Sequence, residues 1–135
     1  MGMDNREWLE KMVRGYLKCA LWSSTDQNGE PLDARFRLEN ISASSTLTAY
    51  DDCLEFVRDC AMADLWDGDE LDRGLCLMPD TFGHDFWLSR NGHGAGFFDR
   101  HELYGKAKGD KLQSIARKFG EVNPFDDGNG WVVFE

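Results

Sequence analysis

The chain has 135 residues, of which 41% are hydrophobic and 13% aromatic, and its formal net charge is −10 at pH 7. This composition excludes a disordered chain, and no apolar run approaches the roughly 20 residues that a membrane span needs. The length fits a single globular domain, residues 1–135, and no basic-then-apolar leader precedes the first predicted helix, so we expect a soluble cytoplasmic protein.

The first predicted element is an amphipathic helix over residues 5–22. Asp4 is suited to its N-cap, and Glu7 completes a pair that resembles a capping box. Apolar residues then recur at helical spacing. Residues 23–31 are rich in turn formers and end the helix, and residues 32–43 are predicted as a loop with a short extended piece at 35–38.

A second amphipathic helix should start near Ser44 or Ser45 and run to about residue 65. Residues 66–81 are ambiguous, because Gly68 and Pro79 interrupt regular structure. The acids of the helix, Asp51, Asp52, Glu55, Asp59 and Asp64, are expected to face water. Its expected inner stripe consists of Leu47, Tyr50, Cys53, Leu54, Val57, Cys60 and Ala61.

Residues 82–100 are the most distinctive part of the chain. They hold five aromatic residues, two of the three histidines and four of the fourteen glycines. Asn91-Gly92 offers the positive-φ positions that a tight turn needs, and aromatic residues flank it. The segment is therefore predicted to form a hairpin with strands at about 83–90 and 94–99.

The last part of the chain predicts a short helix and a second hairpin. Asp110 and Gly120 suit the cap and the stop of a helix over 110–119. Residues 121–125 and 131–134 flank a turn rich in Asp, Gly and Asn. The expected fold class is α+β, with a small antiparallel sheet of two hairpins packed against two long amphipathic helices and the short helix.

The four cysteines form no Cys-x-x-Cys pair. Without a signal for an oxidising compartment, we expect reduced and mostly buried thiols. Cys53 and Cys60 are seven residues apart, which separates them by about 10 Å along a helix, too far for a disulfide. No metal or other cofactor is expected.

Residues 51–72 carry nine acids against one base, Arg58. Such a stretch repels nucleic acid and attracts basic surfaces, although a solvated helix face is the ordinary explanation of it. The sharper interpretation is a surface that imitates nucleic-acid phosphates. Its candidate partner-binding residues are Asp59, Asp64, Trp66, Asp67, Asp69, Glu70 and Asp72.

The predicted first hairpin also concentrates side chains that could carry chemistry. A histidine pair with a carboxylate could bind a divalent metal or transfer protons near neutral pH. The candidate catalytic residues are His84, Asp85, Arg90 and His93. His84 and His93 match no recognised ligand spacing, so the alternative is a hydrogen-bonded scaffold in which Asp85 and Arg90 form a structural ion pair.

The same segment carries a resemblance to a known family. Residues 83–100 read Gly-His-Asp-Phe-Trp, then Leu88 and Ser89, then Arg-Asn-Gly-His-Gly-Ala-Gly-Phe and, after Phe98, Asp-Arg. This core resembles the signature of small, mostly uncharacterised proteins of tailed bacteriophages. The resemblance extends to residues 20–26, 28–33 and 52–53. It implies a viral protein that acts in the cytoplasm of a bacterial host cell, and no catalytic residue is carried over from it.

Two functions of different classes remain open. The first is a phage accessory protein without enzymatic activity that binds and inhibits a host protein through its acidic surface, as an anti-CRISPR-like inhibitor of a defence nuclease would. The second is a small enzyme or metal-binding protein that uses the His84, Asp85 and His93 hairpin. A homodimer formed through sheet edges is a third possibility. Direct binding to nucleic acid is disfavoured by the net charge, although residues 100–118 carry six bases.

Overall fold

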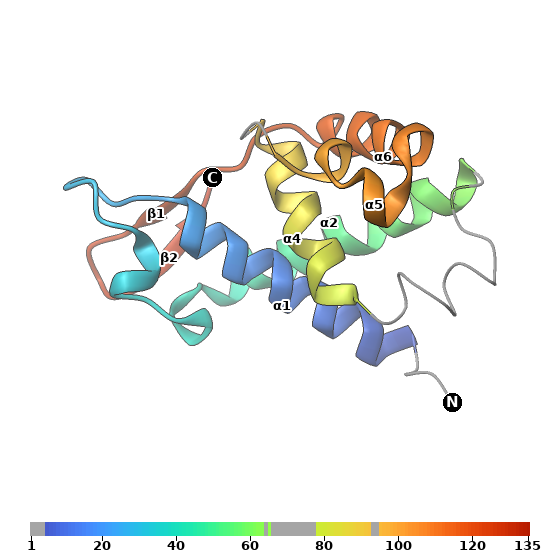
Figure 1. The fold of residues 1–135 in the computed structure, drawn as a ribbon. Helices are drawn as coiled ribbons and strands as arrows, with labels where there is room; N and C mark the ends of the chain where they lie inside the picture. The colour runs from blue at the N-terminus through green and yellow to red at the C-terminus, as the bar shows by residue number, and fades with distance from the viewer. Residues whose placement is uncertain (1–4, 64, 66–77, 93–94) are drawn as a thin grey trace.

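The computed structural model describes residues 5–63, 65, 78–92 and 95–135. Four helices form its body, and two short strands form an antiparallel hairpin near the C-terminus (Figure 1). Single turns of helix connect these elements. The elements are α1 (Asn5–Ser23), η1 (Leu32–Ala34), η2 (Leu38–Asn40), α2 (Ala43–Met62), α4 (Pro79–Arg90), η4 (Phe97–Asp99), α5 (His101–Tyr104), α6 (Lys106–Arg117), β1 (Pro124–Asp126) and β2 (Val132–Phe134).

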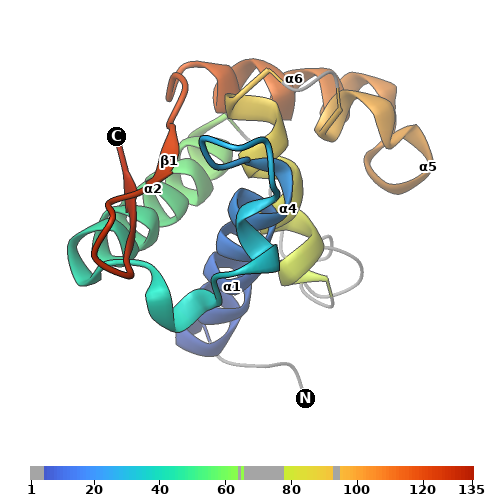
Figure 2. The same ribbon diagram turned by 90° about the vertical axis from the view of Figure 1, so that its left-hand side faces the viewer.

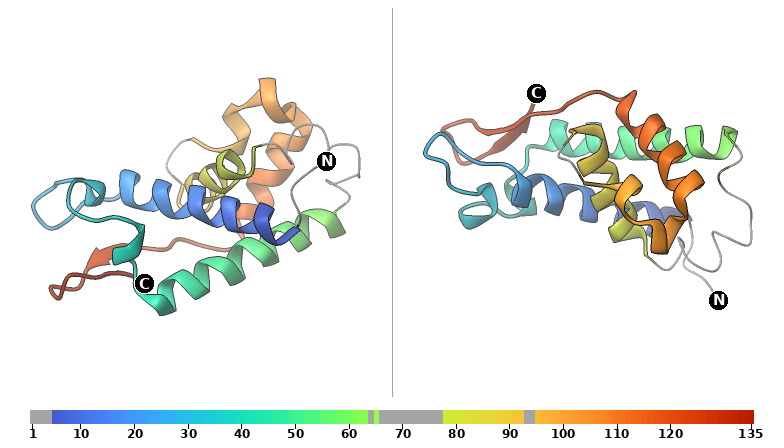
Figure 3. Two further views of the ribbon diagram at one scale, coloured as in Figure 1. Left: turned by 90° about the horizontal axis from the view of Figure 1, so that it is seen from below. Right: turned by 45° about the horizontal axis from the view of Figure 1, so that its top comes forward.

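The helices surround a shared core, and the hairpin lies at one end of it. α1 and α2 run in opposite directions (Figure 1). α6 packs against α4 and α2 (Figure 2). The hairpin lies where α2 begins (Figure 3), because Ile41 forms a parallel bridge with Val132 and the Ser42 amide donates to the Val132 carbonyl at 2.9 Å. The C-terminal hairpin thus holds the start of α2 in place.

Three predicted helices and one predicted hairpin are confirmed. α1 matches the helix predicted over 5–22, α2 covers most of the second helix, and α6 ends before Gly120, whose φ of 77° suits a helix stop. The predicted start of the short helix is wrong, because α6 begins at Lys106 and Asp110 lies inside it, where it pairs with Lys106 at 3.0 Å. β1 and β2 confirm the second hairpin. The loop predicted over 32–43 contains two single turns of helix instead of an extended piece.

The hairpin predicted over 82–100 is wrong, because residues 79–90 form helix α4. Pro79 starts the helix, and a proline at the first helical position loses no intrahelical bond. The turn signal was real: Gly92 has φ of 66°, but it follows the C-terminus of a helix and does not join two strands. The sheet therefore has one hairpin, and the α+β class holds with far more helix than expected.

The inner face of α2 also differs from the predicted stripe. The buried residues are Ser45, Ala49, Cys53, Phe56 and Cys60. Leu47 and Leu54, expected inside, are 65% and 37% exposed. Phe56 decides this orientation, because its ring stacks on that of Phe86 with centroids 4.1 Å apart and is buried completely.

Aromatic rings make up the centre of the core. Phe56, Phe82, Phe86 and Phe97 are all fully buried and contact one another, with centroid distances from 4.1 to 5.6 Å. They come from α2, α4 and η4, so this cluster holds three elements together. Aromatic pairs in such geometry stabilise a core beyond the area that they bury.

α1 and α4 cross in close contact at two glycines. A Cβ on Gly15 would overlap the Asp80 carbonyl, and a Cβ on Gly83 would overlap the Met12 carbonyl. Both glycines are buried inside helices, where glycine is normally unfavourable. They are used here because only a missing side chain lets the two backbones approach this closely.

The cysteines for which a position is described are buried free thiols, as predicted: Cys19, Cys53 and Cys60. Burial raises the pKa of Cys19 and of Cys60 to about 12, so these thiols stay protonated and weakly reactive at neutral pH. Within the described residues, no helix is both long and apolar enough to span a membrane.

Replacing Gly83 by alanine tests the helix crossing. In an ordinary helix this change stabilises the protein by up to about 1 kcal/mol through helix propensity. Here the added methyl group forces α1 away from α4, and we expect a loss of about 2 kcal/mol or more in the free energy of unfolding, measured in urea. Gly15→Ala should behave in the same way, and a gain in stability for either variant would contradict the close crossing.

Candidate functional site

Arg90, near the end of α4, is a buried cation with a side chain only 4% exposed. Its Nη1 donates to Asp52 Oδ2 at 2.7 Å and to Tyr16 Oη at 3.0 Å. Nε and Nη2 donate to the carbonyls of Gly120 and Phe119 at 2.8 and 2.9 Å. One guanidinium therefore ties together α1, α2, α4 and the segment that follows α6.

Asp85, one turn earlier, is the matching buried anion and is completely inaccessible. Its carboxylate accepts hydrogen bonds from Arg100 Nε at 2.8 to 2.9 Å and from Tyr104 Oη at 2.9 Å. Burial and the Asp85 charge raise the pKa of Tyr104 well above its usual value. Burial lowers the pKa of Arg100, but Asp85 more than offsets this, so both partners stay protonated.

Other polar groups of α4 and of its C-cap also bind segments that are distant in the sequence. The bonds run from Trp87 Nε1 to Ser23 Oγ, from Ser89 Oγ to Gln113 Oε1, and from the Val122 amide to Asn91 Oδ1. Among the described residues, every buried side-chain nitrogen or oxygen has a hydrogen-bond partner. The polar side chains inside this helix are thus used to hold the fold together.

The candidate catalytic residues are divided between separate places. His84 Nδ1 lies 3.3 Å from Asp85 Oδ1. Arg90 belongs to the Asp52 network, and the predicted ion pair between Asp85 and Arg90 is wrong, because residues five apart on a helix point in different directions. His93 lies outside the described residues. Of the candidate catalytic residues, His84 and Asp85 therefore lie together, and Arg90 lies apart from them.

His84 faces a cleft of about 500 Å³ between α1 and the start of α4, here named the α1–α4 cleft. The His84 ring is 33% exposed and packs near Trp22, with ring centroids 5.9 Å apart. The residues that line the cleft are Lys11, Arg14, Gly15, Lys18, Pro79, Asp80, Thr81, His84 and Arg100. Four of these nine residues carry a positive charge.

The sequence contained a signal for this cleft that our interpretation missed. Lys11, Arg14 and Lys18 stand at i, i+3 and i+7 on the predicted first helix, which places them on one face. Arg100 joins them only through its tertiary contact with Asp85. The pattern that the sequence shows is thus a row of three basic residues on one helix face of a protein that is acidic overall.

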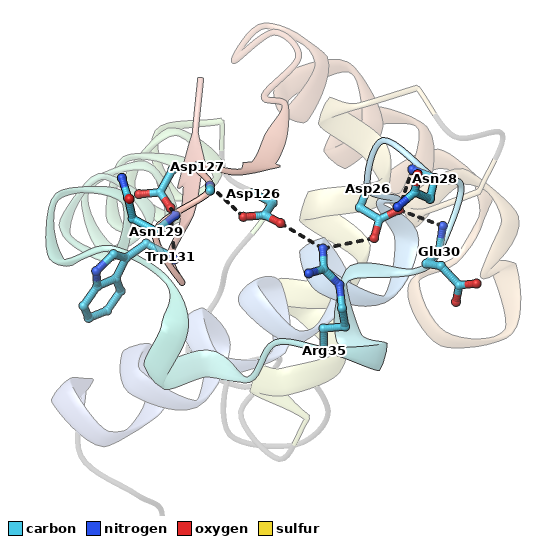
Figure 4. A network of polar contacts seen from close by, with 9 residues as sticks. Asp26, Asn28, Glu30, Arg35, Asp126, Asp127, Asn129 and Trp131 are labelled. Carbon is cyan, nitrogen blue, oxygen red and sulfur yellow. Dashed lines mark hydrogen bonds and ion pairs between the residues drawn. The ribbon is translucent and has the colours of Figure 1, made fainter.

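Two acidic turns approach each other at the hairpin end of the molecule (Figure 4). Arg35 Nη2 lies between them and donates to Asp26 Oδ2 at 3.0 Å and to Asp126 Oδ2 at 2.8 Å. The other oxygen of each carboxylate accepts backbone amides of its own turn, from Asn28 and Glu30 in one and from Gly128 in the other. Carboxylates near such loops can form cation sites, but here an arginine supplies the charge.

The electrostatics agree with this arrangement. Backbone hydrogen bonds, foremost those from Glu30 and Gly128, together with Arg35 hold the pKa of Asp26 and of Asp126 below the usual 3.8. In the part of the chain that the structure describes, no group of three or more His, Cys, Asp or Glu residues is arranged to hold a metal ion.

The outer face of α2 is formed by Leu47, Asp51, Leu54, Glu55, Arg58 and Met62, and it exposes three large apolar side chains. Leu47, Leu54 and Met62 are 65%, 37% and 85% exposed, and both acids are exposed as well. Asp52 is an exception to the predicted acidic face, because it pairs with Arg90. Of the candidate partner-binding residues, Asp59 lies on α2 and is partly exposed, whereas Asp64, Trp66, Asp67, Asp69, Glu70 and Asp72 lie outside the described residues.

Comparison of the chain with models of protein families, with curated proteins and with solved structures finds no match. The resemblance of residues 83–100 to bacteriophage proteins therefore stays a prediction.

Replacing Arg90 by lysine tests the buried network. Lysine keeps the charge, but it cannot bind two carbonyls, a hydroxyl and a carboxylate in the geometry of a guanidinium. We expect a loss of about 2 to 4 kcal/mol in the free energy of unfolding in urea. Arg14→Lys is the matched control, since Arg14 is exposed and forms no ion pair with another described residue, and it should change stability by less than about 0.5 kcal/mol. Equal effects of the two changes would refute the network's role.

The pH dependence of stability tests the Arg35 bridge. A carboxyl with a pKa lowered by folding stabilises the protein above its unfolded value of 3.8, and this contribution disappears as the pH falls through the lower folded value. Arg35→Gln removes part of the lowering, so its stability should fall less steeply below pH 3.8 than that of the wild type. Urea midpoints at several acidic pH values measure this, and Arg37→Gln is a control at an exposed neighbour. Parallel profiles for wild type and Arg35→Gln would exclude the bridge.

Proposed function

We propose that this protein acts by binding another protein, without chemistry of its own, and that the outer face of α2 is the docking surface. The observation that carries the proposal is the exposure of Leu47, Leu54 and Met62 on one helix face that also presents Asp51 and Glu55. Exposed apolar side chains rimmed by charged residues, here the acids Asp51 and Glu55 and the base Arg58, are typical of interfaces.

The geometry of α2 supports this role. Positions 47, 51, 54, 58 and 62 follow one another at helical spacing, and they lie opposite the buried positions 49, 53, 56 and 60. The apolar groups can therefore contact one partner together. In interfaces a few such side chains supply most of the binding energy when a partner buries them, and exposed acids speed the formation of the complex.

The charge of this surface favours a partner with a basic face. Asp51, Glu55 and the half-exposed Asp59 outnumber Arg58 along the helix. Acids on an exposed face speed association with a cationic surface and make it sensitive to salt. The particular partner that we propose is a host nuclease of bacterial defence; its support is the excess of acids over residues 51–72 together with the resemblance to bacteriophage proteins.

The polar residues of α4 offer less support for an enzyme. Asp85 and Arg90 are buried and bound by several protein groups, as scaffold residues are. His84 keeps a carboxylate neighbour and an exposed edge, but the other members of the predicted catalytic set do not join it among the described residues. Binding is therefore the function that the described geometry favours.

The test is a comparison of matched variants. Leu54→Ser with Met62→Ser removes apolar area from the outer face of α2, and Trp131→Ser removes an exposed apolar side chain from the hairpin as a control. Proteins captured from a bacterial lysate by immobilised wild type are identified by mass spectrometry. We expect one basic protein that wild type and Trp131→Ser retain and the double variant loses, with an affinity at least about tenfold lower.

The purified partner then tests the electrostatic part. Asp51→Asn with Glu55→Gln should lower the association rate about two- to tenfold at low salt and change dissociation little. Asp33→Asn with Glu39→Gln makes the same charge change on exposed residues of the 32–43 segment and should have a smaller effect. If no captured protein distinguishes wild type from the apolar variant, the proposal is wrong. It is also wrong if sedimentation shows that the outer face of α2 pairs with a second copy of the chain.

A further inference from the structure

We propose that the α1–α4 cleft binds a small molecule through its phosphate group, held by Arg14, Lys18 and Arg100. The cleft has a volume of about 500 Å³, which lies in the range of small-molecule sites. It shares no residue with the outer face of α2, so this inference and the proposed function can fail separately.

The local charge is the first argument. The protein carries −10 overall, yet the cleft is lined by four cations and one carboxylate, that of Asp80. Lys11 lies 3.9 Å from Glu7, and Arg100 is paired with Asp85. For Arg14 and Lys18 the described part of the chain provides no ion pair. A concave surface of this sign concentrates anions.

The second argument is that the buried carboxylate of Asp85 holds the side chain of Arg100 in place. Asp85 is buried completely and binds Arg100 through Nε, which fixes the guanidinium plane at the edge of the cleft. Within the described residues no hydrogen bond occupies its terminal nitrogens. A planar guanidinium with free terminal donors matches phosphate oxygens, which is why arginine is common at phosphate sites.

The third argument is the rigidity of the floor. Gly15 lines the cleft, and its backbone packs directly against that of Asp80, so that the two walls of the cleft are in close contact. The His84 ring is oriented by Asp85 on one side and by Trp22 on the other. A site whose side chains are already held in place loses little conformational entropy when a ligand binds.

The exposed ring of Trp22 suggests what else the ligand carries. Trp22 is 59% exposed and lies one helical turn beyond Lys18 on α1, beside His84. A planar group attached to the phosphate could stack there, as bases stack on aromatic side chains. A nucleoside monophosphate should therefore bind more tightly than inorganic phosphate, although both satisfy the shared chemistry.

The experiment is a titration of the full chain with adenosine monophosphate, inorganic phosphate and adenosine at constant ionic strength. Amide and indole NMR signals report the dissociation constant and the location of binding. We expect both phosphates to shift the Gly15 signal, the nucleotide at the lower concentration, and only the ligands that carry the base to shift the Trp22 indole signal. Adenosine should bind at least about tenfold more weakly than the nucleotide.

Matched variants locate the site. Arg14→Gln with Lys18→Gln should weaken nucleotide binding at least about tenfold. Lys111→Gln with Arg117→Gln makes the same charge change on exposed residues of α6 and should leave binding within about twofold of the wild type. Unfolding curves in urea check the fold, and both double variants should unfold at the same urea concentration as the wild type.

Three results would overturn the inference. The first is the absence of binding by either phosphate up to about 10 mM, a concentration at which even a very weak site is occupied. The second is equal binding of adenosine and its monophosphate, which would show that the phosphate contributes nothing. The third is an equal loss in the two double variants, which would attribute binding to overall charge.

Discussion

Helix α4 places two charged side chains, Arg90 and Asp85, in the interior. The surrounding elements must supply the polar groups that bind these charges, and this requirement determines where those elements lie. An unpaired ion in an apolar interior costs several kcal/mol, so α4 can be buried only when Arg90 and Asp85 find partners. Arg90 finds Asp52 on α2, Tyr16 on α1 and two carbonyls after α6. Asp85 finds Arg100 and Tyr104 beyond η4. The helix and its neighbours therefore have to assemble together.

Because of this constraint, the charged side chains of Asp85 and Arg90 are used in the interior of the protein and not on its surface. Helix α4 buries the polar side chains of Asp85, Ser89 and Arg90, and each of them is already bound by other groups of the protein. The two surfaces that we propose for binding, the outer face of α2 and the α1–α4 cleft, lie outside this interior. Asp85 connects the two regions, because the same buried carboxylate that secures α4 also orients Arg100 and His84 at the cleft.

The charges are unevenly distributed over this surface. The outer face of α2 and the turns bridged by Arg35 are acidic, whereas the α1–α4 cleft is basic despite the overall charge of −10. Arg35 neutralises two carboxylates at the hairpin end. The exposed acids of α2 have less compensation, since Arg58 is the base among them. Such a distribution allows a cationic protein and a small anion to bind at different places without competing.

The sequence by itself determined the elements whose signals are local. α1, the C-terminal end of α6 and the C-terminal hairpin were predictable because helical periodicity, stop residues and turn residues act within a few positions, and the positive φ at Gly92 was predictable for the same reason. Tertiary structure decided the rest. α4 is buried on nearly all sides, so it has no polar stripe that would reveal a helical period, and its aromatic residues resembled those of a strand. The inner face of α2 follows the contact of Phe56 with Phe86, which leaves Leu47 and Leu54 in solvent, and the basic cleft exists only because two glycines let α1 and α4 meet. These features depend on contacts between residues far apart in the chain, which local patterns do not record. For the cleft, the sequence shows only that Lys11, Arg14 and Lys18 share one helix face.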